Sequence, residues 1–565
     1  MAMVNRKTAS KKAHVKKKMV KSSDKKGSNK GVPTFLKAGN SLYGPEVIGH
    51  HWINGKFLRG ANHVASVNPA DLSDLVGRFP NAGGKDIEAA VAAAEKGFKN
   101  WKAVPAPVRG TVIGRLAKII EREKESLARI ITREIGKTLK EARGEVQEAI
   151  DTAEFFQSEG RRLYGQTVPS ELPNKELFTY RRPLGVCLMI TASNFPFAVP
   201  SWKMIPALLA GNSVIWKPSE DAPATAMSFA LCFREAGFPD GVVNLLFGDR
   251  AVGEKLLTYV DKNRIQKVSF TGSTAVGRKI GEVCGRAIQV PSLELGGKNP
   301  LIIHKDANLE KAVPAAIVSC YGTAGQRCTS TGNIIIHKEV YEEFKSRFIA
   351  AAKNIRIGNP LLVPETFYGP LIAERYLKNF IAHLEWGKKD GGKLLMGTGR
   401  ITKFTPYGNF LGKNPEAGYF VTPTLWENVT PKNRLFQEEV FGPTVNLVKA
   451  SSFDQALEYA NAHAYGLSSA IFTEDPHIML KFKEGIQAGM SSINNSTTGA
   501  EAHLPFGGVK ASGNGTRESG VWVLDSYTRW HAVNVDLASQ LQLAQMDVDY
   551  GSAKSPTDFS EWVKK

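Results

Sequence analysis

The order of apolar and polar positions predicts alternating strands and helices in the middle of the chain. Continuous apolar runs at 185–191, 213–216 and 242–247 have the length of buried β-strands. Between them, residues 198–209 and 222–236 carry apolar side chains at helical spacing, and a glycine directly follows the second segment. Strands that alternate with helices require crossover connections, so the pattern predicts an α/β fold with a largely parallel sheet.

The segments before this region predict one short strand, a turn-rich stretch and helices. Residues 51–57 resemble one short strand, and 64–74 form a turn-rich stretch around an Asn-Pro-Ala-Asp sequence. From 85 to 101 and from 108 to 140, apolar residues recur at helical spacing. We therefore expect helices between a short first strand and the parallel sheet.

The remaining segments continue the alternation without a repeat of fixed period. Further apolar runs that fit strands lie at 256–259, 268–270, 288–291, 301–303, 334–337 and 466–472. Further helices are expected over 340–353 and 453–463. The polar, glycine-bearing stretch 406–415 is expected to be a surface loop.

The positive charge of the chain is concentrated at its N-terminus. The 565 residues carry a formal net charge of +19, of which the first 30 residues contribute +10 through eleven basic side chains and one acid. A segment with so little to bury predicts a basic, disordered tail over residues 1–40. Such a tail is a solvated end, a nonspecific attractor of nucleic acid or anionic membrane, or a transit peptide, and the sequence leaves these open.

Composition excludes several classes of protein. No run of about 18 apolar residues occurs, so no membrane-spanning helix is expected. The five cysteines are irregularly spaced and form no Cys-x-x-Cys motif, which argues against a disulfide framework or a metal site. This cysteine usage fits a reducing compartment, and we expect a cytoplasmic protein. No motif that reads DNA or RNA accompanies the basic tail, so no specific nucleic-acid partner is expected.

Cys328 is the first candidate for chemistry. It lies in the polar, glycine-rich sequence TAGQRCTSTGN, whereas a structural cysteine usually lies in an apolar run, as Cys187 does. Arg327 precedes it, and a neighbouring cation favours the thiolate form that acts as a nucleophile. On residue types alone, a structural cysteine or a cysteine paired with a distant histidine remain alternatives.

Two further residues could complete such a site. Glu294 lies between leucines in LELGGK, where desolvation would raise its pKa towards that of a general base. An ion pair with Lys298 is the alternative. Asn194 follows a predicted strand in TASNFP, where its amide could donate to an oxyanion or could simply form a turn.

Two segments fit a nucleotide at the ends of parallel strands. FTGSTAVG, residues 270–277, places a glycine at the end of a strand and Ser273 at the start of a helix, where free N–H groups bind phosphate. Its spacing departs from the usual dinucleotide fingerprint. KPSE follows another strand, and its Lys217 and Glu220 suit ribose hydroxyls. Each segment alone could equally be a plain strand-to-helix turn.

Taken together and in this order, TASNFP, WKPSE, FTGS, LELGGK, GQRC, EEVFGP and PFGGVK resemble the aldehyde dehydrogenase superfamily. The resemblance runs from about residue 51 to about 530. It implies an aldehyde dehydrogenase fold that assembles as a homodimer or homotetramer. Its implied parts are a Rossmann-like nucleotide-binding domain (41–164 and 184–295), a β oligomerisation arm (165–183 and 524–540), an α/β catalytic domain (296–523) and a C-terminal extension (541–565).

The resemblance also implies roles for individual residues. Cys328 matches the catalytic thiol, Glu294 the general base and Asn194 the oxyanion donor. Positions that match cofactor contacts are Lys217 and Glu220 at the adenosine ribose, Gly272 and Ser273 at the pyrophosphate, and Glu439 and Phe441 beside the nicotinamide. Phe506 matches a wall of the substrate tunnel, and Trp202 either lines the same tunnel or is a core aromatic. No metal is implied.

The implied reaction is the oxidation of a small-molecule aldehyde with NAD. NADP is possible, because Lys217 could offset the repulsion between Glu220 and a 2′-phosphate. The stretch NNSTTGAEAH before PFGG is similar to relatives that act on semialdehydes of amino or dicarboxylic acids, and Arg327 could steer a substrate carboxylate. A CoA-acylating relative and a catalytically silent protein on the same fold are the alternatives.

Overall fold

The computed structural model describes residues 36–37 and 42–548. The predicted tail at 1–40 lies outside the described residues except for the two-residue strand β1, which pairs with β2 (Glu46–Ile48). Most of the predicted C-terminal extension also lies outside them. None of the helices in the described part of the chain is long and apolar enough to cross a membrane.

A seven-stranded sheet forms the first core, in the order β13-β12-β9-β10-β11-β3-β4. Its first five strands are parallel: β13 (Ser292–Glu294), β12 (Lys267–Thr271), β9 (Val186–Ile190), β10 (Ser213–Lys217) and β11 (Val243–Leu245). The predicted parallel α/β arrangement is confirmed. The expected strand at 288–291 is wrong, because Ile288 adopts a left-handed φ of 54° and β13 begins only after this turn.

The other edge of this sheet is a hairpin where one strand was expected. Strands β3 (His51–Ile53) and β4 (Lys56–Leu58) pair antiparallel across a two-residue turn. Asn54 and Gly55 at the turn have φ values of 50° and 75°. A tight turn of this kind requires positive φ at both central residues, which Asn and Gly adopt at low cost.

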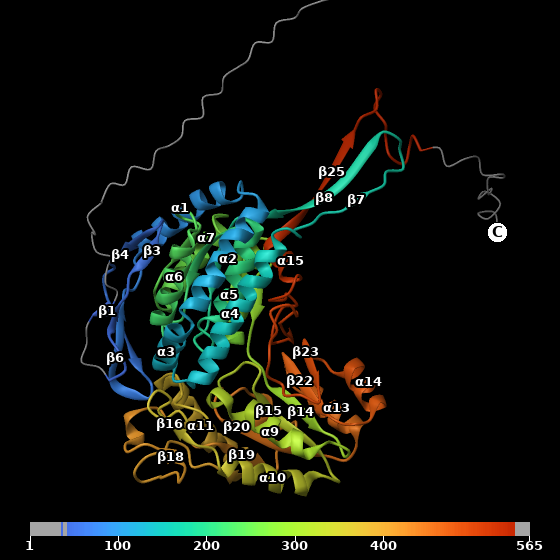
Figure 1. Cartoon of the computed structure of the whole chain (residues 1–565). Helices are drawn as coiled ribbons and strands as arrows, with labels where there is room; N and C mark the ends of the chain where they lie inside the picture. Colours follow the sequence, from blue (N-terminus) through green and yellow to red (C-terminus); the bar gives the residue numbers. More distant parts are fainter. Residues whose placement is uncertain (1–35, 38–41, 549–565) are drawn as a thin grey trace, which may run out of the picture. The chain divides into compact units, whose positions relative to one another are not determined.

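Helices cover both faces of the parallel strands. They are α1 (Gly84–Trp101), α2 (Ala106–Arg122), α3 (Lys124–Ile135), α4 (Leu139–Glu159), α5 (Ala198–Ala210), α6 (Pro223–Ala236), α7 (Arg250–Asp261) and α8 (Thr274–Arg286). The helices α2, α4 and α5 pack on one another (Figure 1). The apolar run at 256–259 belongs to α7, because four residues cannot distinguish a buried strand from the inner face of a helix.

The predicted helix over 108–140 is interrupted twice. It breaks at Glu123, between α2 and α3. It ends at Gly136, whose left-handed φ of 75° closes α3 before α4 begins. The turn-rich stretch at 64–74 is also more regular than expected, because it holds β5 (Val64–Asn68) and the start of β6 (Asp71–Phe79) on either side of the predicted turn.

A second seven-stranded sheet has the order β17-β19-β20-β15-β14-β22-β23. Its strands are β17 (Lys393–Met396), β19 (Thr424–Glu427), β20 (Thr444–Ala450), β15 (Thr331–His337), β14 (Asn299–Ile303), β22 (Ser468–Phe472) and β23 (Met490–Ile493). Only β17 is antiparallel. The surrounding helices include α9 (Leu309–Tyr321), α10 (Tyr341–Lys353), α11 (Glu374–Lys389), α13 (Phe453–Asn461) and α14 (Pro476–Gly485).

Two smaller features complete the architecture. A three-stranded antiparallel sheet joins β25 (Thr528–Asp536), β8 (Lys175–Pro183) and β7 (Thr167–Val168), and extends away from the helices in Figure 1. It pairs the two segments that the resemblance assigned to an arm. The expected loop at 406–415 contains the short strand β18 (Phe410–Leu411), which pairs with β16 (Ile357–Gly358).

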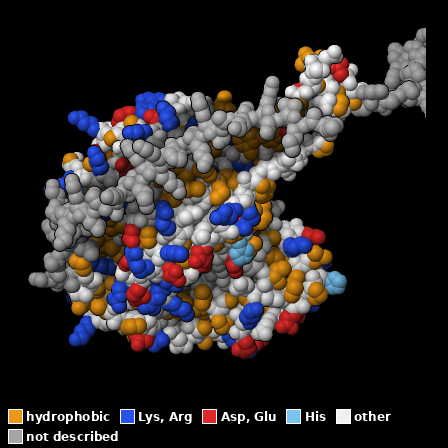
Figure 2. Space-filling view, turned by 45° about the horizontal axis from the view of Figure 1, so that its top comes forward, with side chains coloured by type: hydrophobic (Ala, Val, Ile, Leu, Met, Phe, Trp, Pro, Cys, Tyr) orange, Lys and Arg blue, Asp and Glu red, His pale blue; other side chains and the backbone are white. Residues whose placement is uncertain are grey.

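Basic and acidic side chains are interspersed on the face of the molecule drawn in Figure 2. The described residues contain no group of three or more His, Cys, Asp or Glu side chains that could hold a metal ion. All five cysteines are free thiols, and only Cys328 is more than slightly exposed.

Two buried carboxylates hold helices to their neighbours. Glu134 of α3 accepts hydrogen bonds from the amides of Ala224 and Thr225, both at 2.7 Å, in the first turn of α6. Glu145 of α4 does the same at the start of α5. Neither α5 nor α6 has a side-chain cap at its own N-cap residue. A carboxylate from another helix therefore satisfies the free amides and complements the helix dipole.

We expect Glu134→Leu to destabilise the fold, because it leaves the buried amides of Ala224 and Thr225 without acceptors. The free energy of unfolding should fall by about 3 kcal/mol, since each unsatisfied buried group costs about 1–3 kcal/mol. Thermal unfolding followed by circular dichroism at one scan rate measures this. Glu121→Leu, at an exposed position on α2, is the control, and an equal loss of stability in both variants would contradict the capping role.

Candidate active site

Cys328 follows a backbone turn of unusual conformation. The 3₁₀ segment Gly322–Gly325 continues from α9, and Thr323 and Ala324 within it have left-handed φ values of 53° and 52°. Left-handed residues other than glycine are strained and persist only where the surroundings hold them. At Gly325, φ is 67° and a Cβ atom would lie 2.2 Å from the carbonyl oxygen of Gly442, so only glycine fits.

The Glu141 carboxylate holds this turn. It accepts hydrogen bonds from the Thr323 amide at 2.8 Å and from the Thr323 hydroxyl at 2.9 Å. It also accepts one from Nη2 of Arg327 at 2.9 Å. Glu141 lies in the first turn of α4, where it completes a capping box with Thr138. The charge of Arg327 is thus already matched by a carboxylate.

A second carboxylate of the same helix holds the loop that carries Asn194. Glu145 accepts hydrogen bonds from the amides of Phe197 at 2.8 Å and Ala198 at 3.2 Å. Lys137 donates to Glu145 at 2.5 Å, and both side chains are fully buried. Since Glu141 and Glu145 are about one helical turn apart, α4 fixes the nucleophile loop and the Asn194 loop relative to each other.

The two loops also touch directly. The side-chain amide of Asn194 donates to the carbonyl oxygen of Gln326 at 3.0 Å. A side-chain amide has two N–H donors, so one remains for a substrate oxygen. Asn194 is 5% exposed, and the contact places its amide beside the segment that ends in Cys328.

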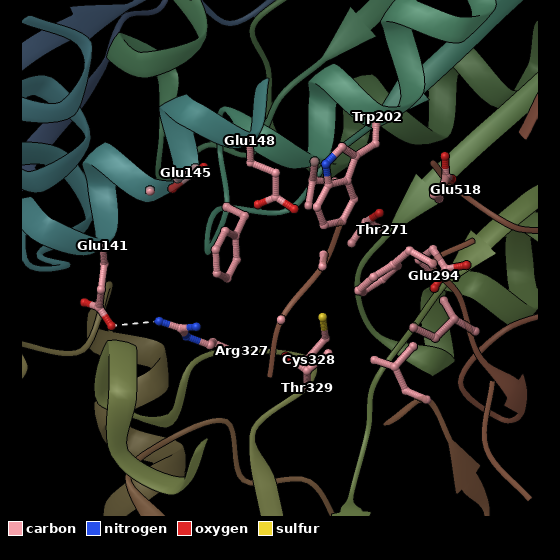
Figure 3. Close-up of a pocket in the computed structure, with 18 residues that line it drawn as sticks. Glu141, Glu145, Glu148, Trp202, Thr271, Glu294, Arg327, Cys328, Thr329 and Glu518 are labelled. Carbon is pink, nitrogen blue, oxygen red and sulfur yellow. Dashed lines mark hydrogen bonds and ion pairs between the residues drawn. The ribbon is translucent and has the colours of Figure 1, made fainter. Parts of the chain in front are cut away.

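A cavity of about 220 Å³ lies over the Cys328 sulfur (Figure 3). Trp202 and Phe506 form an aromatic wall of this cavity with ring centroids 4.8 Å apart, and their contact with a substrate stays a prediction. Arg327 and Glu294 line the same cavity. No histidine is among the described residues that line it, so the alternative of a cysteine–histidine pair has no support here.

Glu294 ends β13 at the edge of this cavity. Its carboxylate is buried, and neither oxygen has a hydrogen-bond partner at good geometry among the described residues. Burial, and then the Glu518 carboxylate, raise the pKa of Glu294 well above its ordinary value, while Lys203 lowers it less. Gly507 makes room for it, because a Cβ atom there would lie 2.6 Å from Oε1 of Glu294. The alternative ion pair with Lys298 is not formed.

A buried ion pair behind Glu294 was missed by the sequence analysis. Nζ of Lys203 lies 2.6 Å from Oε1 of Glu518 and also donates to the hydroxyl of Ser269 at 2.9 Å. All three side chains are buried. One signal was visible, because Lys203 is the only charged residue in the apolar helix α5.

The environment of Cys328 opposes ionisation of the thiol. Burial, and then the carboxylates of Glu294 and Glu439, raise the pKa of Cys328 to about 12, against a smaller lowering by the Cys328 and Thr329 amides. The Arg327 side chain points to Glu141 (Figure 3) and does not act as the expected activating cation. The thiol therefore needs a base or a further positive charge to become a thiolate.

A second cavity of about 280 Å³ lies on the other side of Cys328. It brings together predicted residues from distant segments: Asn194, Gly272, Ser273, Glu439 and Phe441. Cys328, Val199, Thr271 and Leu295 line both cavities. The sulfur thus lies where the two cavities meet.

The second cavity carries groups that suit the nicotinamide ribose and pyrophosphate of a dinucleotide. Helix α8 begins beside Ser273 at the carboxyl edge of the parallel sheet, and no side chain caps its first amides, which leaves them available to a phosphate. The half-buried Glu439 carboxylate accepts one hydrogen bond, from the Gly297 amide at 3.1 Å, and retains acceptor capacity for ribose hydroxyls.

Lys217 and Glu220 line neither cavity. Lys217 ends β10 at the same edge of the sheet, where it is buried and donates to the carbonyl oxygen of Pro218 at 3.1 Å. Glu220 is exposed. Their contact with a nucleotide stays a prediction. At Gly272 the structure gives a local reason for glycine, because a Cβ atom would lie 2.5 Å from the Phe270 ring.

Comparison with known proteins identifies the family of this chain. The model of the aldehyde dehydrogenase family matches residues 57–533. The chain is 38% identical to the alpha-ketoglutaric semialdehyde dehydrogenase of Bacillus subtilis over 481 residues. This alignment covers 85% of this chain and 96% of that protein. It is 36% identical to the 2,5-dioxopentanoate dehydrogenase of Saccharolobus solfataricus, over 84% of this chain and 96% of that protein.

Solved structures show the same fold. The NAD-dependent aldehyde dehydrogenase of Sinorhizobium meliloti superposes with a TM-score of 0.83 at 31% identity, over 88% of this chain and 96% of that one. The predictions of an aldehyde dehydrogenase fold and of a dehydrogenase enzyme are therefore confirmed: the chain belongs to the aldehyde dehydrogenase family.

Proposed function

We propose that this enzyme oxidises an aldehyde to the carboxylic acid through a thioester on Cys328. One observation carries the proposal: Cys328 lines both the cavity with the buried Glu294 and the cavity that fits a dinucleotide. Bound in the second cavity, NAD or NADP would supply the hydride acceptor. The substrate would enter the first cavity, and its carbonyl carbon would meet the sulfur where the cavities join.

The first step begins with loss of the Cys328 thiol proton to water, which a positively charged ring in the second cavity would favour, and the thiolate then attacks the aldehyde. A C–S bond forms, and the carbonyl oxygen becomes an oxyanion. The second N–H of the Asn194 amide and the backbone N–H of Cys328 are the proposed donors to it, and one such donor is typically worth about 3–4 kcal/mol. Loss of hydride from the carbon then leaves a thioester on Cys328.

Glu294 releases the acid. Its raised pKa makes it a base able to take a proton from water near neutral pH. The resulting hydroxide attacks the thioester carbon, the C–S bond breaks, and Cys328 leaves as the thiolate. The Lys203–Glu518 pair lies behind Glu294 and acts as a positioning group, because its charges set the field that the Glu294 carboxylate feels.

We assign the cofactor contacts to the residues that the structure gathers at the sheet edge. Ser273 and the first amides of α8 would hold the pyrophosphate, and Glu439 the nicotinamide ribose. Lys217 and Glu220 would meet the adenosine ribose. NAD is the favoured form, because the Glu220 carboxylate would repel a 2′-phosphate.

The proposed substrate is a semialdehyde of an amino or dicarboxylic acid. Relatives with 36–38% identity are named for such substrates. Arg327 lines the first cavity, and while Nε and Nη2 are engaged by Thr323 and Glu141, Nη1 has no hydrogen-bond partner among the described residues. This nitrogen is the proposed contact for the carboxylate.

We further propose that the β7–β8–β25 sheet is an oligomerisation arm. An isolated three-stranded sheet leaves apolar side chains without a core, and Val168, Trp530 and Leu537 are 46%, 49% and 67% exposed. Such exposed apolar groups mark contact surfaces. The domain limits and the cytoplasmic location given above stay predictions.

We expect Cys328→Ala to lower NAD reduction by more than about 10³-fold, as removal of a nucleophile does in other enzymes. Absorbance of the reduced nicotinamide, followed with a panel of aldehydes and semialdehydes, measures this. Cys232→Ala, at a buried cysteine that lines neither cavity, is the control. Full turnover by Cys328→Ala would refute the thioester route.

We expect Glu294→Gln to trap the thioester, because water is no longer activated. The steady-state rate should fall by about 10²–10⁴-fold, and intact mass spectrometry should show the acyl adduct on Cys328. In the wild type, kcat should fall as the pH drops below the raised pKa of Glu294, since the protonated carboxyl cannot act as a base; the variant should lose this dependence. Unchanged release of acid would contradict the role, and release to CoA alone would favour the acylating alternative.

We expect Trp530→Glu to shift the protein towards smaller assemblies, because it places a charge on the proposed contact surface. Size-exclusion chromatography with light scattering measures the mass. Phe404→Glu alters an even more exposed aromatic residue outside the arm and serves as the control. An unchanged mass of the Trp530 variant would contradict the assignment.

A further inference from the structure

One face of helix α4 presents three carboxylates to the first cavity. Glu141, Glu145 and Glu148 are spaced by four and three residues, which places them on the same side of a helix. All three line the cavity. Glu141 is engaged by the nucleophile turn and Glu145 by the start of α5. Glu148 has no such structural task.

Of these three carboxylates, that of Glu148 has an oxygen atom that accepts no hydrogen bond within the described part of the chain. Its Oε1 atom is buried and has no hydrogen-bond partner among the described residues. In Figure 3 the carboxylate points into the cavity, towards the space above Cys328. A buried acceptor without a donor is costly, so an unmatched one in a cavity wall indicates a group that arrives from outside.

A matching unsatisfied donor lies in the same wall. Trp202 is 6% exposed, yet its Nε1 atom has no acceptor among the residues that the structure describes. Helix α5, which carries Trp202, packs against α4. The indole nitrogen is on the edge of the ring that faces Glu148 (Figure 3). The cavity therefore offers one acceptor and one donor to the same ligand.

From these contacts we propose that Glu148 and Trp202 form a subsite for a hydroxyl group of the aldehyde, so that the enzyme prefers an aldehyde with a hydroxyl at this position to the same aldehyde without it. The inference rests on the proposed function and names a group that its substrate carries. A hydroxyl can donate to Glu148 and accept from Trp202 at once. A carboxylate only accepts, and an ammonium only donates, so each would leave one of the two partners unmatched when Glu148 is ionised.

The ionisation of Glu148 does not alter this choice. Burial, and then the Glu145 carboxylate, raise the pKa of Glu148 to about 8, so both forms are populated near neutral pH. A hydroxyl bonds to either form, whereas an ammonium is matched only by the ionised form and a carboxylate only by the protonated one. Lys137 is committed to Glu145, and Arg327, whose Nη2 atom pairs with Glu141, keeps only Nη1 for the proposed carboxylate contact.

The test compares aldehydes that differ only at the far end. For the full-length enzyme with NAD, kcat/KM is measured for each alkanal from propanal to hexanal and for its terminal hydroxyl, amino and carboxylate derivatives. At the chain length at which the hydroxyl reaches Glu148, kcat/KM for the hydroxyl derivative should exceed kcat/KM for the parent alkanal by about ten-fold or more. This is the discrimination expected of a site that hydrogen-bonds a hydroxyl.

Two variants then remove the partners separately. Glu148→Met deletes the acceptor at similar size, and Trp202→Phe deletes the donor but keeps an aromatic ring. Each should reduce the ratio of kcat/KM between hydroxyl derivative and parent alkanal towards one. Because both substrates are measured with the same variant, a general loss of structure would not change this ratio. Glu154→Gln, an exposed acid on the same helix, should keep the wild-type ratio.

The outcomes separate the two proposals. Equal kcat/KM for parent and hydroxyl derivatives at every length, a preference for the amino derivative, a carboxylate preference that is lost in Glu148→Met and Trp202→Phe, or a hydroxyl preference that survives both variants would overturn the subsite while leaving aldehyde oxidation intact. Failure to oxidise any member of the panel would overturn the proposed function, and the subsite with it.

Discussion

The catalytic centre depends on one set of contacts, the hydrogen bonds by which two carboxylates of helix α4 hold two loops. Glu141 binds the turn before Cys328, and Glu145 binds the start of α5 after Asn194. Both loops are irregular, and neither would keep its conformation from local preference alone. A single rigid helix converts two flexible connections into a fixed pair of nucleophile and oxyanion donor, which is the precision that bond formation at a carbonyl requires.

Both carboxylates also take part in ion pairs, and this limits how much they contribute to the stability of the fold. The Lys137–Glu145 pair is fully buried, so each charge is tolerated only because the other is present. Removing one partner of such a pair typically costs about 3–5 kcal/mol, while the net gain over an apolar pair is small. The carboxylates of α4 are thus better understood as devices for placement than as sources of stability. They also hold Thr323 and Ala324 in left-handed conformations that would otherwise relax.

The site combines a thiol that resists ionisation with a carboxyl group that resists it too. Burial drives both pKa values upwards, and the Glu294 carboxylate raises the pKa of Cys328 further because two negative charges at one site repel. In the ligand-free protein this favours the neutral thiol. A positively charged ring in the adjoining cavity would favour the thiolate, so the electrostatics link reactivity to the filling of both cavities.

The sequence by itself determined the parallel sheet, the helices that follow its strands, and the identity of Cys328, Glu294 and Asn194 as candidates, because apolar periodicity and local motifs are properties of short segments. The hairpin at Asn54 has a local Asn-Gly signal that the prediction of a single strand did not use, whereas the strand after the predicted turn at 64–74 also depends on the pairing of β6 with β2. Only the tertiary structure decided that Arg327 is matched by Glu141 rather than left to activate Cys328. It alone brought Lys203 to Glu518, 315 positions later in the chain, and left Glu148 facing the cavity. Burial and charge pairing are set by which segments meet in space, and no local pattern encodes them.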